Sequence, residues 1–519
     1  MATMFDALNS LLCASCFISH MDGVGANCFG QVDRLVQPFY EADLAAGRVT
    51  EEEARFLIHT FLFKSDGHAH YNEKRTTYDN GVTVMIGGQD MQGNPIYNDI
   101  TRMIMDAYAE TRFINPKLNA RACAASPKEY LLGLARLMIE GSNSVIMEND
   151  EYIVPMFQRM GLKPEDARRY AGNGCQEVIC PHQLHSRAFI YLNLAKVLVD
   201  TLNYARTGVP EDPYCQIYKQ GKFDITSFDA LLDSYLTNLR SFIATIAENL
   251  RPMEALHPQI NPEPIHSCFT DDCVARGQDI AEGGALYNNK TFAMYAFGTL
   301  CDSLLALRKA YEEGTVDTLL AATDANFEGY EVLRSRLQSG PNRFGHSEEA
   351  DQFAAELAHH LSQVSRGIYN ADGIEWRTSL FTYYIFSSRN GAATPDGRLA
   401  GSIYSRQMNM AAIPDLTQAA ISMSKICDLD FNDVGMFDIS LPLGGGEAAV
   451  QAMADYLAVC VKLRIPVLQV NVADRQKLVE ERQHHGTHPD LVVRVCGFSA
   501  YFAQLGPVSQ DEIISRLGA

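Results

Sequence analysis

The chain has 519 residues and a net charge of −20, with 47% hydrophobic and 20% charged residues. This acidic balance argues against nucleic acid as a partner, because phosphate binding requires basic patches. The chain contains neither an apolar run of about 18 residues nor a recognisable targeting leader, so we expect neither a membrane span nor export.

Helical patterns dominate the chain. Thr50 is suited to cap a helix, and Glu51–Glu53 gives that helix the acidic first turn that its dipole favours. In chain order, the apolar spacing predicts helices over Met1–Ser19, Glu51–Phe63, Asn98–Thr111, Ser126–Glu140, Pro164–Tyr170, Asp229–Leu250, Thr291–Glu313, His346–Arg366 and Gly446–Leu463.

Short β-rich runs lie between these helices. They predict strands over Val82–Ile86, Ser144–Met147, Phe381–Ser387, Pro466–Val472 and Leu491–Val495. Helices that alternate with short buried strands indicate an α/β fold with a largely parallel sheet. The spacing alone does not distinguish an open sheet from a barrel. Segments rich in turn residues mark weak boundaries near Val209–Pro213 and Ser387–Gly401.

One glycine interrupts a run of large apolar residues near the C-terminus. Gly497 lies inside Arg494–Phe502, where a glycine weakens a strand and therefore needs a reason. One interpretation is a tight loop between a strand and the closing helix. The other is chemical: the α-carbon of glycine carries no side chain, so loss of one α-hydrogen leaves a planar radical. The flanking amide nitrogen and carbonyl both delocalise its unpaired electron.

A second segment, Gly174-Cys175-Gln176-Glu177, lies far from Gly497 in the sequence. Together the two segments resemble the Arg-Val-x-Gly-Phe/Tyr-Ser-Ala motif and the Gly-Cys-x-Glu loop of the glycyl radical enzymes, the pyruvate formate-lyase-like superfamily. The resemblance implies that Gly497 stores a radical and that Cys175 becomes a transient thiyl radical. Further matching segments are Phe29–Asp33, Pro38–Leu44, Asp79–Val82, Gly87–Asp90, Asn149–Glu151, Asp279–Asn288, Ala393–Arg398 and Val470–Val472.

The resemblance also implies a fold. We expect the ten-stranded α/β barrel of the glycyl radical enzymes, with a helix-rich outer layer and with the cysteine and glycine loops meeting inside it. We expect a barrel domain with the thiyl loop over residues 1–390, followed by a C-terminal glycine radical domain over residues 391–519.

The chain departs from the family pattern at three places. Typical members carry a long N-terminal portion, whereas this chain starts well inside that pattern. We therefore expect either a naturally short member or another component that covers the missing flank. Gln31 stands where the family usually has arginine, and Cys496 stands where alanine or serine is commoner. A thiol beside the radical can quench it or relay it, and both interpretations stay open.

The residue two positions after Cys175 indicates the class of reaction. In an extended loop, Glu177 and Cys175 point to the same face, where a carboxylate can act as general acid/base; the alternative is that Glu177 caps the next helix. In the family, Cys-x-Glu marks eliminating and decarboxylating members. Gln176 replaces the second cysteine of pyruvate formate-lyase, which disfavours acyl transfer to coenzyme A.

The resemblance thus implies a glycyl radical lyase. We expect a dehydratase or related eliminase that cleaves a C–O, C–N or C–S bond of a small polar substrate. One alternative is a decarboxylase or a C–C lyase similar to formate acetyltransferase. An alternative of another class is a non-catalytic scaffold relative, which the short N-terminus and Cys496 motivate.

Other polar residues are candidates for binding. Cys180, His182 and His185 are spaced as a conceivable metal cluster, but no second cluster matches them. We therefore expect no metal and place His182 and His185 along the substrate. Alternation lets only one of the adjacent tyrosines of the strand Phe381–Ser387 face the pocket, and we assign Tyr383. The histidine-rich segment 484–488 is interpreted as a solvated loop.

The expected partners follow from the radical chemistry. The chain would bind no cofactor, because a separate radical S-adenosylmethionine activating enzyme with an iron–sulfur cluster installs the glycyl radical. We also expect a homodimer and an oxygen-poor cytoplasm, since oxygen cleaves the backbone at a glycyl radical. Thirteen cysteines, an odd number with uneven spacing, agree with reduced thiols.

Overall fold

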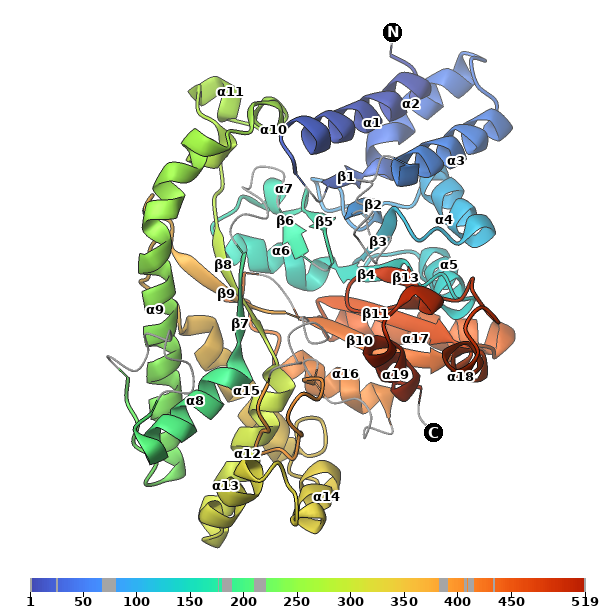
Figure 1. Ribbon diagram of the computed structural model, residues 1–519. Helices are drawn as coiled ribbons and strands as arrows, with labels where there is room; N and C mark the ends of the chain where they lie inside the picture. The colour runs from blue at the N-terminus through green and yellow to red at the C-terminus, as the bar shows by residue number, and fades with distance from the viewer. Residues whose placement is uncertain are drawn as a thin grey trace. The chain divides into compact units, whose positions relative to one another are not determined.

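A computed structural model describes residues 2–24, 27–67, 81–175, 177–179, 189–209, 221–381, 391–405, 408, 415–432 and 435–517 (Figure 1). The chain divides into two compact units. The first comprises Met1–Ser186, Pro258–Asn288 and Met436–Ala519, and the second comprises Arg187–His257 and Asn289–Gly435. The first unit thus joins the two ends of the sequence, and it holds both Cys175 and Gly497.

A six-stranded sheet forms the centre of the first unit. Its order is β1 (Asn27–Gln31), β2 (Val82–Gly87), β3 (Lys117–Ala122), β4 (Val145–Asn149), β11 (Val467–Ala473) and β10 (Met436–Pro442). Strands β1 to β4 are parallel, β11 runs antiparallel to β4, and β10 is parallel to β11. The sheet is therefore largely parallel, as the sequence predicts.

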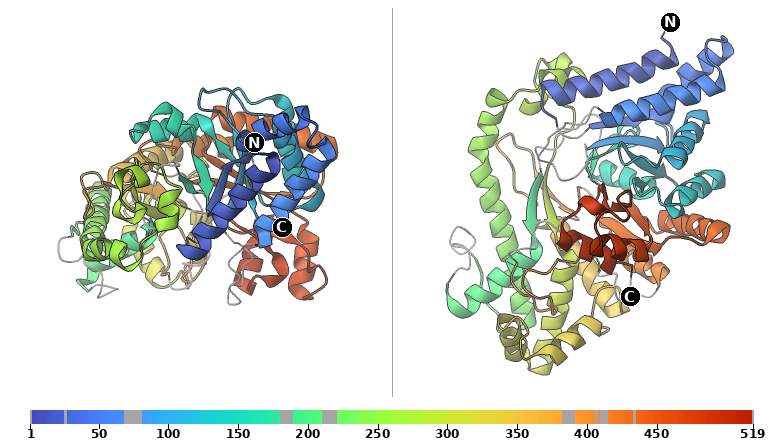
Figure 2. Two further views of the ribbon diagram at one scale, coloured as in Figure 1. Left: turned by 90° about the horizontal axis from the view of Figure 1, so that it is seen from above. Right: turned by 45° about the vertical axis from the view of Figure 1, so that its right-hand side comes forward.

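Some of the helices of the first unit pack in series beside this sheet. The unit contains α1 (Met4–Met21), α2 (Val32–Ala45), α3 (Glu51–Gly67), α4 (Asp99–Thr111), α5 (Lys128–Ile139), α6 (Asp150–Arg159), α7 (Pro164–Ala167), α17 (Gly446–Lys462), α18 (Arg475–Gln483) and α19 (Pro507–Ser515). Helix α2 contacts α4, α4 contacts α5, and α5 contacts α17, so these helices form a row beside the strands (Figure 2). Short helices α10 (Pro264–Cys268) and α11 (Cys273–Arg276) complete the unit.

One face of the sheet is polar although it is buried. Arg121 pairs with Glu148 across β3 and β4, and both Asn119 and Gln469 pair with Ile146 in the neighbouring strands. Because paired residues project to the same face, Asn119, Arg121, Glu148 and Gln469 share one surface, and each is at most 2% exposed. Burying so many polar side chains costs free energy unless they are hydrogen-bonded. Their concentration on one face therefore makes this face a candidate functional site.

Two short hairpins carry the motif residues. Strands β5 (Ala171–Asn173) and β6 (Glu177–Ile179) are antiparallel, and Cys175 lies in the turn between them. Strands β12 (Val492–Arg494) and β13 (Ser499–Tyr501) form the second hairpin, and Gly497 lies in its turn. Both motif residues thus stand at hairpin tips.

The second unit has a smaller parallel sheet. Its order is β7 (Phe189–Asn193), β8 (Lys290–Tyr295) and β9 (Trp376–Leu380), with both neighbouring pairs parallel. The helices between and after these strands are α8 (Leu194–Thr207), α9 (Phe228–Ile260), α12 (Phe297–Glu313), α13 (Val316–Asp324), α14 (Glu331–Ser339), α15 (Glu348–Gln363) and α16 (Leu416–Lys425).

The structure corrects several predicted elements. The predicted helix Thr291–Glu313 was wrong at its start, because Lys290–Tyr295 is the central strand β8 and the helix begins at Phe297. Every residue of β8 is buried, so the run has no alternation by which a strand is recognised. The predicted helix Pro164–Tyr170 is shorter, since α7 ends at Ala167. The predicted strand Phe381–Ser387 lies outside the described residues except for Phe381, which follows β9.

Candidate active site

Gly497 and Cys175 lie against each other. A β-carbon built on Gly497 would overlap the β-carbon of Cys175 and lie 2.9 Å from its α-carbon. An α-hydrogen of Gly497 occupies that direction, so one of its two α-hydrogens points at the Cys175 side chain. The φ angle of Gly497 is +87°, a region that side-chain-bearing residues rarely adopt. Both the contact and the backbone conformation therefore require glycine at position 497.

The turn around Gly497 is held by side chains from the sheet. Arg494, which is fully buried, donates from Nη2 to the carbonyl oxygen of Gly497 at 3.0 Å and from Nε to Oε1 of Gln469 at 2.7 Å. The amide of Gly497 donates to the same Gln469 oxygen at 3.3 Å. Both polar groups of the Gly497 residue thus have a partner, and the three residues form one closed hydrogen-bonded ring.

The C-terminal helix fixes the strand that enters this turn. Arg516, at the end of α19, donates from Nη1 to the carbonyl of Arg494 at 2.9 Å and from Nη2 to that of Val495 at 2.8 Å. Its side chain is only 1% exposed and pairs with Glu512 one helical turn earlier. The backbone immediately before Gly497 is therefore attached to α19 as well as to its own hairpin.

The cysteine hairpin is pressed onto the polar face of the sheet. Thr83 donates to the carbonyl of Gly172 at 2.7 Å. A β-carbon on Gly172 would overlap the amide of Asn119 and the carboxyl of Glu148, so only glycine allows this approach. At the tip, the Cys175 amide donates to Oε2 of Glu177 at 2.7 Å. Glu177 thus closes the turn that carries Cys175, and its half-buried carboxylate lies beside that residue.

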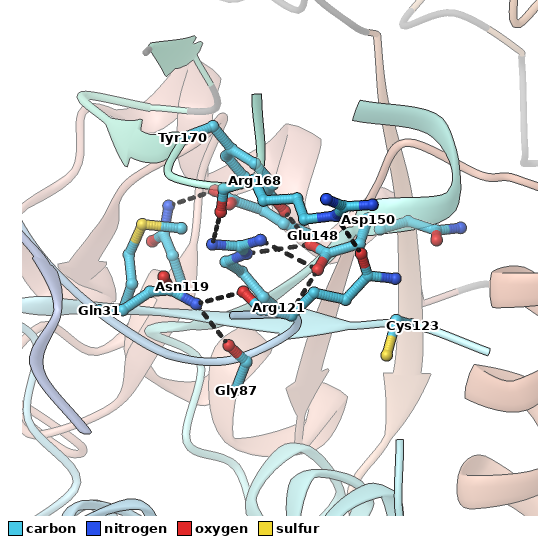
Figure 3. Close-up of polar contacts among 12 residues, drawn as sticks. Gln31, Gly87, Asn119, Arg121, Cys123, Glu148, Asp150, Arg168 and Tyr170 are labelled. Atoms are coloured by element: carbon cyan, nitrogen blue, oxygen red, sulfur yellow. Dashed lines mark hydrogen bonds and ion pairs between the residues drawn. The ribbon is translucent and has the colours of Figure 1, made fainter. Parts of the chain in front are cut away.

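A buried ion pair anchors the chain as it enters β5. Arg121 makes two 2.9 Å contacts with Asp150, and both side chains are 0% exposed (Figure 3). Arg121 also donates to the carbonyl of Arg168 at 2.9 Å, and the Tyr170 hydroxyl donates to Asp150 at 2.8 Å. The guanidinium carbon lies 4.0 Å from the centre of the Tyr170 ring. The cluster therefore fixes residues 168–170, which lead directly into the Cys175 hairpin.

Glu148 lies beside this ion pair on the same face. Its carboxyl accepts a 2.6 Å hydrogen bond from Asn119, and burial raises the pKa of the Glu148 carboxyl to about 8. The other carboxyl oxygen, Oε2, has no partner among the residues that the structure describes. At neutral pH the folded protein therefore holds this carboxyl largely protonated.

We expect Glu148→Gln to change the pH dependence of stability. Below about pH 4.5 Glu148 is protonated in both states; as pH rises to about 8, the unfolded chain ionises first and stability is lost. Glutamine cannot ionise, so relative to the natural protein the variant gains about 2–4 kcal/mol at pH 8.5 compared with pH 5. Urea unfolding at the two pH values measures this difference. An identical pH profile for both proteins would contradict the assignment.

The remaining candidate residues have different outcomes. His182, His185 and Tyr383 lie outside the described residues, so their substrate contacts stay predictions. Cys496 is 3% exposed, and burial raises the pKa of its thiol to about 12. This thiol is therefore protonated and is a poor nucleophile.

The histidine-rich loop makes contacts with glutamates. His488 lies 2.8 Å from Glu480 and His485 lies 3.3 Å from Glu481. Within the part of the chain that the structure describes, no group of three or more His, Cys, Asp and Glu side chains is arranged to hold a metal ion. In the same part, no helix is both long and apolar enough to cross a membrane.

Sequence reasoning missed the residues that support the two hairpins. Arg121, Asn119 and Gln469 lie on strands and lack a motif of their own. Their signal is alternation: polar residues recur at positions 117, 119 and 121 of β3 and at positions 469 and 471 of β11. Period-two polarity inside otherwise apolar strands indicates one polar face of a buried sheet.

Comparison with known proteins identifies the family. The Pyruvate formate lyase-like family model matches residues 2–386, and the Glycine radical model matches residues 437–503. The first match covers most of the chain, and the second includes Gly497. The chain belongs to the pyruvate formate lyase-like family. The resemblance to glycyl radical enzymes that the motifs predict is confirmed.

Individual members of the pyruvate formate lyase-like family align along nearly the whole chain. Trans-4-hydroxy-L-proline dehydratase of Clostridioides difficile is 26% identical over 506 residues, which are 94% of this chain and 64% of the relative. Isethionate sulfite-lyase of Desulfovibrio desulfuricans is 27% identical over 520 residues, which are 94% of this chain and 61% of the relative. The chain thus spans about three fifths of the length of these relatives.

A solved structure of the family shares the fold. A glycyl radical enzyme from Archaeoglobus fulgidus superposes with a TM-score of 0.89 and 22% identity, covering 99% of this chain and 68% of the other. The predicted α/β fold class of the glycyl radical enzymes is thereby confirmed. Within the described residues, the strands form a six-stranded sheet, a three-stranded sheet and two two-stranded hairpins.

Proposed function

We propose that the protein is a glycyl radical lyase that eliminates a leaving group from a small polar substrate. In this proposal Gly497 stores the radical, Cys175 transfers it to substrate and Glu177 handles protons. The contact between Gly497 and Cys175 carries the proposal, because hydrogen transfer between two groups requires them to meet. The glycine radical domain over residues 391–519, and the preceding domain over residues 1–390, belong to the same proposal.

The chemistry is redox-neutral over one turnover. The Gly497 radical takes a hydrogen atom from the Cys175 thiol, and the resulting thiyl takes one from a substrate C–H bond. The substrate radical loses its leaving group together with the proton of the adjacent hydroxyl. The product radical then takes a hydrogen atom from the Cys175 thiol, and the thiyl regenerates the Gly497 radical. No external oxidant or reductant is consumed.

Glu177 is suited to the proton steps of this sequence. Its carboxylate lies next to Cys175, where the substrate carbon must also lie, and it is held there by the Cys175 amide. A carboxylate can take the hydroxyl proton and return it to the leaving group. Elimination is preferred over acyl transfer because the neighbours of Cys175 are Gly174 and Gln176, not a second cysteine. Decarboxylation and C–C cleavage remain the alternative reactions, and a non-catalytic relative remains the alternative class.

The proposal includes a partner and substrate contacts. A separate radical S-adenosylmethionine activating enzyme with an iron–sulfur cluster would abstract the first α-hydrogen of Gly497, since forming the radical is the kind of one-electron chemistry that cofactors supply. His182, His185 and Tyr383 are the proposed substrate-binding residues.

Electron paramagnetic resonance tests the proposal. Anaerobic incubation with the activating enzyme, S-adenosylmethionine and a reductant is expected to give a doublet signal, because one α-hydrogen remains on Gly497. Gly497→Ala is expected to give no signal. Exposure of the activated protein to oxygen is expected to cleave the backbone at position 497, which mass spectrometry detects. Absence of a doublet in the natural protein, or its persistence in Gly497→Ala, contradicts the proposal.

A further inference from the structure

The residues around Gly497 contact both polar groups that flank its α-carbon. The amide N–H donates to Oε1 of Gln469, and the carbonyl oxygen accepts from Nη2 of Arg494. Arg494 also donates to Gln469, so the two side chains act as one unit. Arg494 and Gln469 are both 0% exposed, and hydrogen bonds are electrostatically stronger in such a water-excluded interior.

These two contacts fall on the groups that delocalise a radical at the α-carbon. The amide nitrogen donates electron density to the radical centre, and the carbonyl withdraws it. A hydrogen bond from the N–H to Gln469 makes the nitrogen a better donor. A charge-assisted hydrogen bond from Arg494 makes the carbonyl a better acceptor, and such bonds are about twice as strong as neutral ones. Each contact therefore favours the radical over the intact glycine.

We propose that Gln469 and Arg494 are positioning residues that set the stability of the radical on Gly497, an inference that rests on the radical site proposed above. Through Gly497 they set the equilibrium between the glycyl radical and the Cys175 thiyl. Stronger delocalisation keeps the radical on the glycine when no substrate is present. Weaker delocalisation moves it to the thiol, which reacts faster with other molecules and loses the radical.

The test compares variants by the doublet signal of the activated, full-length chain. Its splitting reports the spin density on the α-carbon. Gln469→Met removes the acceptor at similar volume, so we expect a wider splitting and a radical lifetime about tenfold shorter, the effect of one hydrogen bond of about 1.4 kcal/mol. Gln469→Glu restores an acceptor and is expected to bring the lifetime back to within about threefold of the natural protein, a difference below 1 kcal/mol.

A matched control separates tuning from loop packing. Ser499 is buried in the same hairpin and contacts Arg494 at 3.4 Å, but it touches neither the N–H nor the carbonyl of Gly497. Ser499→Ala is expected to keep the splitting of the natural protein. If circular dichroism shows that Gln469→Met is unfolded, Arg494→Lys decides instead, because lysine keeps the charge and loses the planar fork. It is likewise expected to widen the splitting.

The outcomes distinguish this inference from the proposed function. A doublet in the natural protein, with unchanged splitting and lifetime in Gln469→Met or Arg494→Lys, overturns the tuning role and leaves the radical site intact. A change of equal size in Ser499→Ala also overturns it. Absence of any doublet in the natural protein overturns the radical site, and the tuning role with it.

Discussion

Cys175→Ala is expected to abolish turnover while the glycyl radical signal survives. Activation requires only the α-hydrogen of Gly497, and alanine fits because the contact at this point is with the β-carbon of residue 175, which alanine retains. Without the thiol, however, the radical has no route to substrate. We expect turnover to fall by at least about 10⁴-fold, the scale seen when a reacting group is removed from a catalytic unit. Spin counting and a product assay on the same activated sample measure both quantities.

Cys496→Ala is the matched control for this experiment. Cys496 is adjacent to Gly497 in sequence, but its thiol is buried and its pKa is raised to about 12 by burial. If Cys496 neither quenches nor relays the radical, its removal leaves turnover and signal unchanged. A longer radical lifetime in Cys496→Ala would identify it as a quencher, and lost turnover would identify it as a relay. Turnover in Cys175→Ala that matches the natural protein contradicts the thiyl assignment.

The sequence predicts the proposed reacting pair, Gly497 and Cys175, better than the residues around it. Gly497 and Cys175 are identifiable because their chemistry restricts the residue type at one position. The polar face of the sheet imposes no such restriction, since many polar side chains can hydrogen-bond there. Arg121 lies on β3 and Asp150 begins α6 directly after β4, so the register of β3 with β4 brings them together. That register depends on packing between distant segments, which spacing along one strand does not contain.

The errors in predicted secondary structure concern strands whose residue pattern is atypical. Strands such as β8 are buried on both faces, so they lack the alternation that would distinguish them from the start of a helix. Conversely, β3 is Lys117-Leu118-Asn119-Ala120-Arg121-Ala122, which alternates polar and apolar residues as a half-exposed strand does, although every residue of it is buried. The second of these failures concerns a strand of the polar face that carries Asn119 and Arg121. On a face that carries a functional site, residue types follow the chemistry of the site and depart from those that a buried strand usually has.

Asp150→Asn is expected to cost about 3–5 kcal/mol in the free energy of unfolding. The variant removes the carboxylate that pairs with Arg121, and the guanidinium then remains in a fully buried position without its ion-pair partner. It also weakens the contacts that Asp150 makes with Tyr170 and with the amide of Gln89. Urea unfolding under anaerobic conditions measures the loss. Arg121→Met combined with Asp150→Leu is expected to be much less destabilising than the single change, because no unpaired charge remains.

Glu447→Gln is the control that separates the effect of burial on stability from the effect of ion-pair geometry. Arg136 holds Glu447 by two contacts of 2.6 and 2.8 Å, an arrangement similar to that of Arg121 and Asp150, but on the surface. Water solvates Arg136 when its partner is neutralised, so we expect little change in stability. Equal losses in Asp150→Asn and Glu447→Gln would mean that ion-pair geometry alone stabilises both sites. A large loss of unfolding free energy only in Asp150→Asn means that burial of the charges makes the Arg121–Asp150 pair necessary for stability. The segment that leads into the Cys175 hairpin then depends on a buried ion pair.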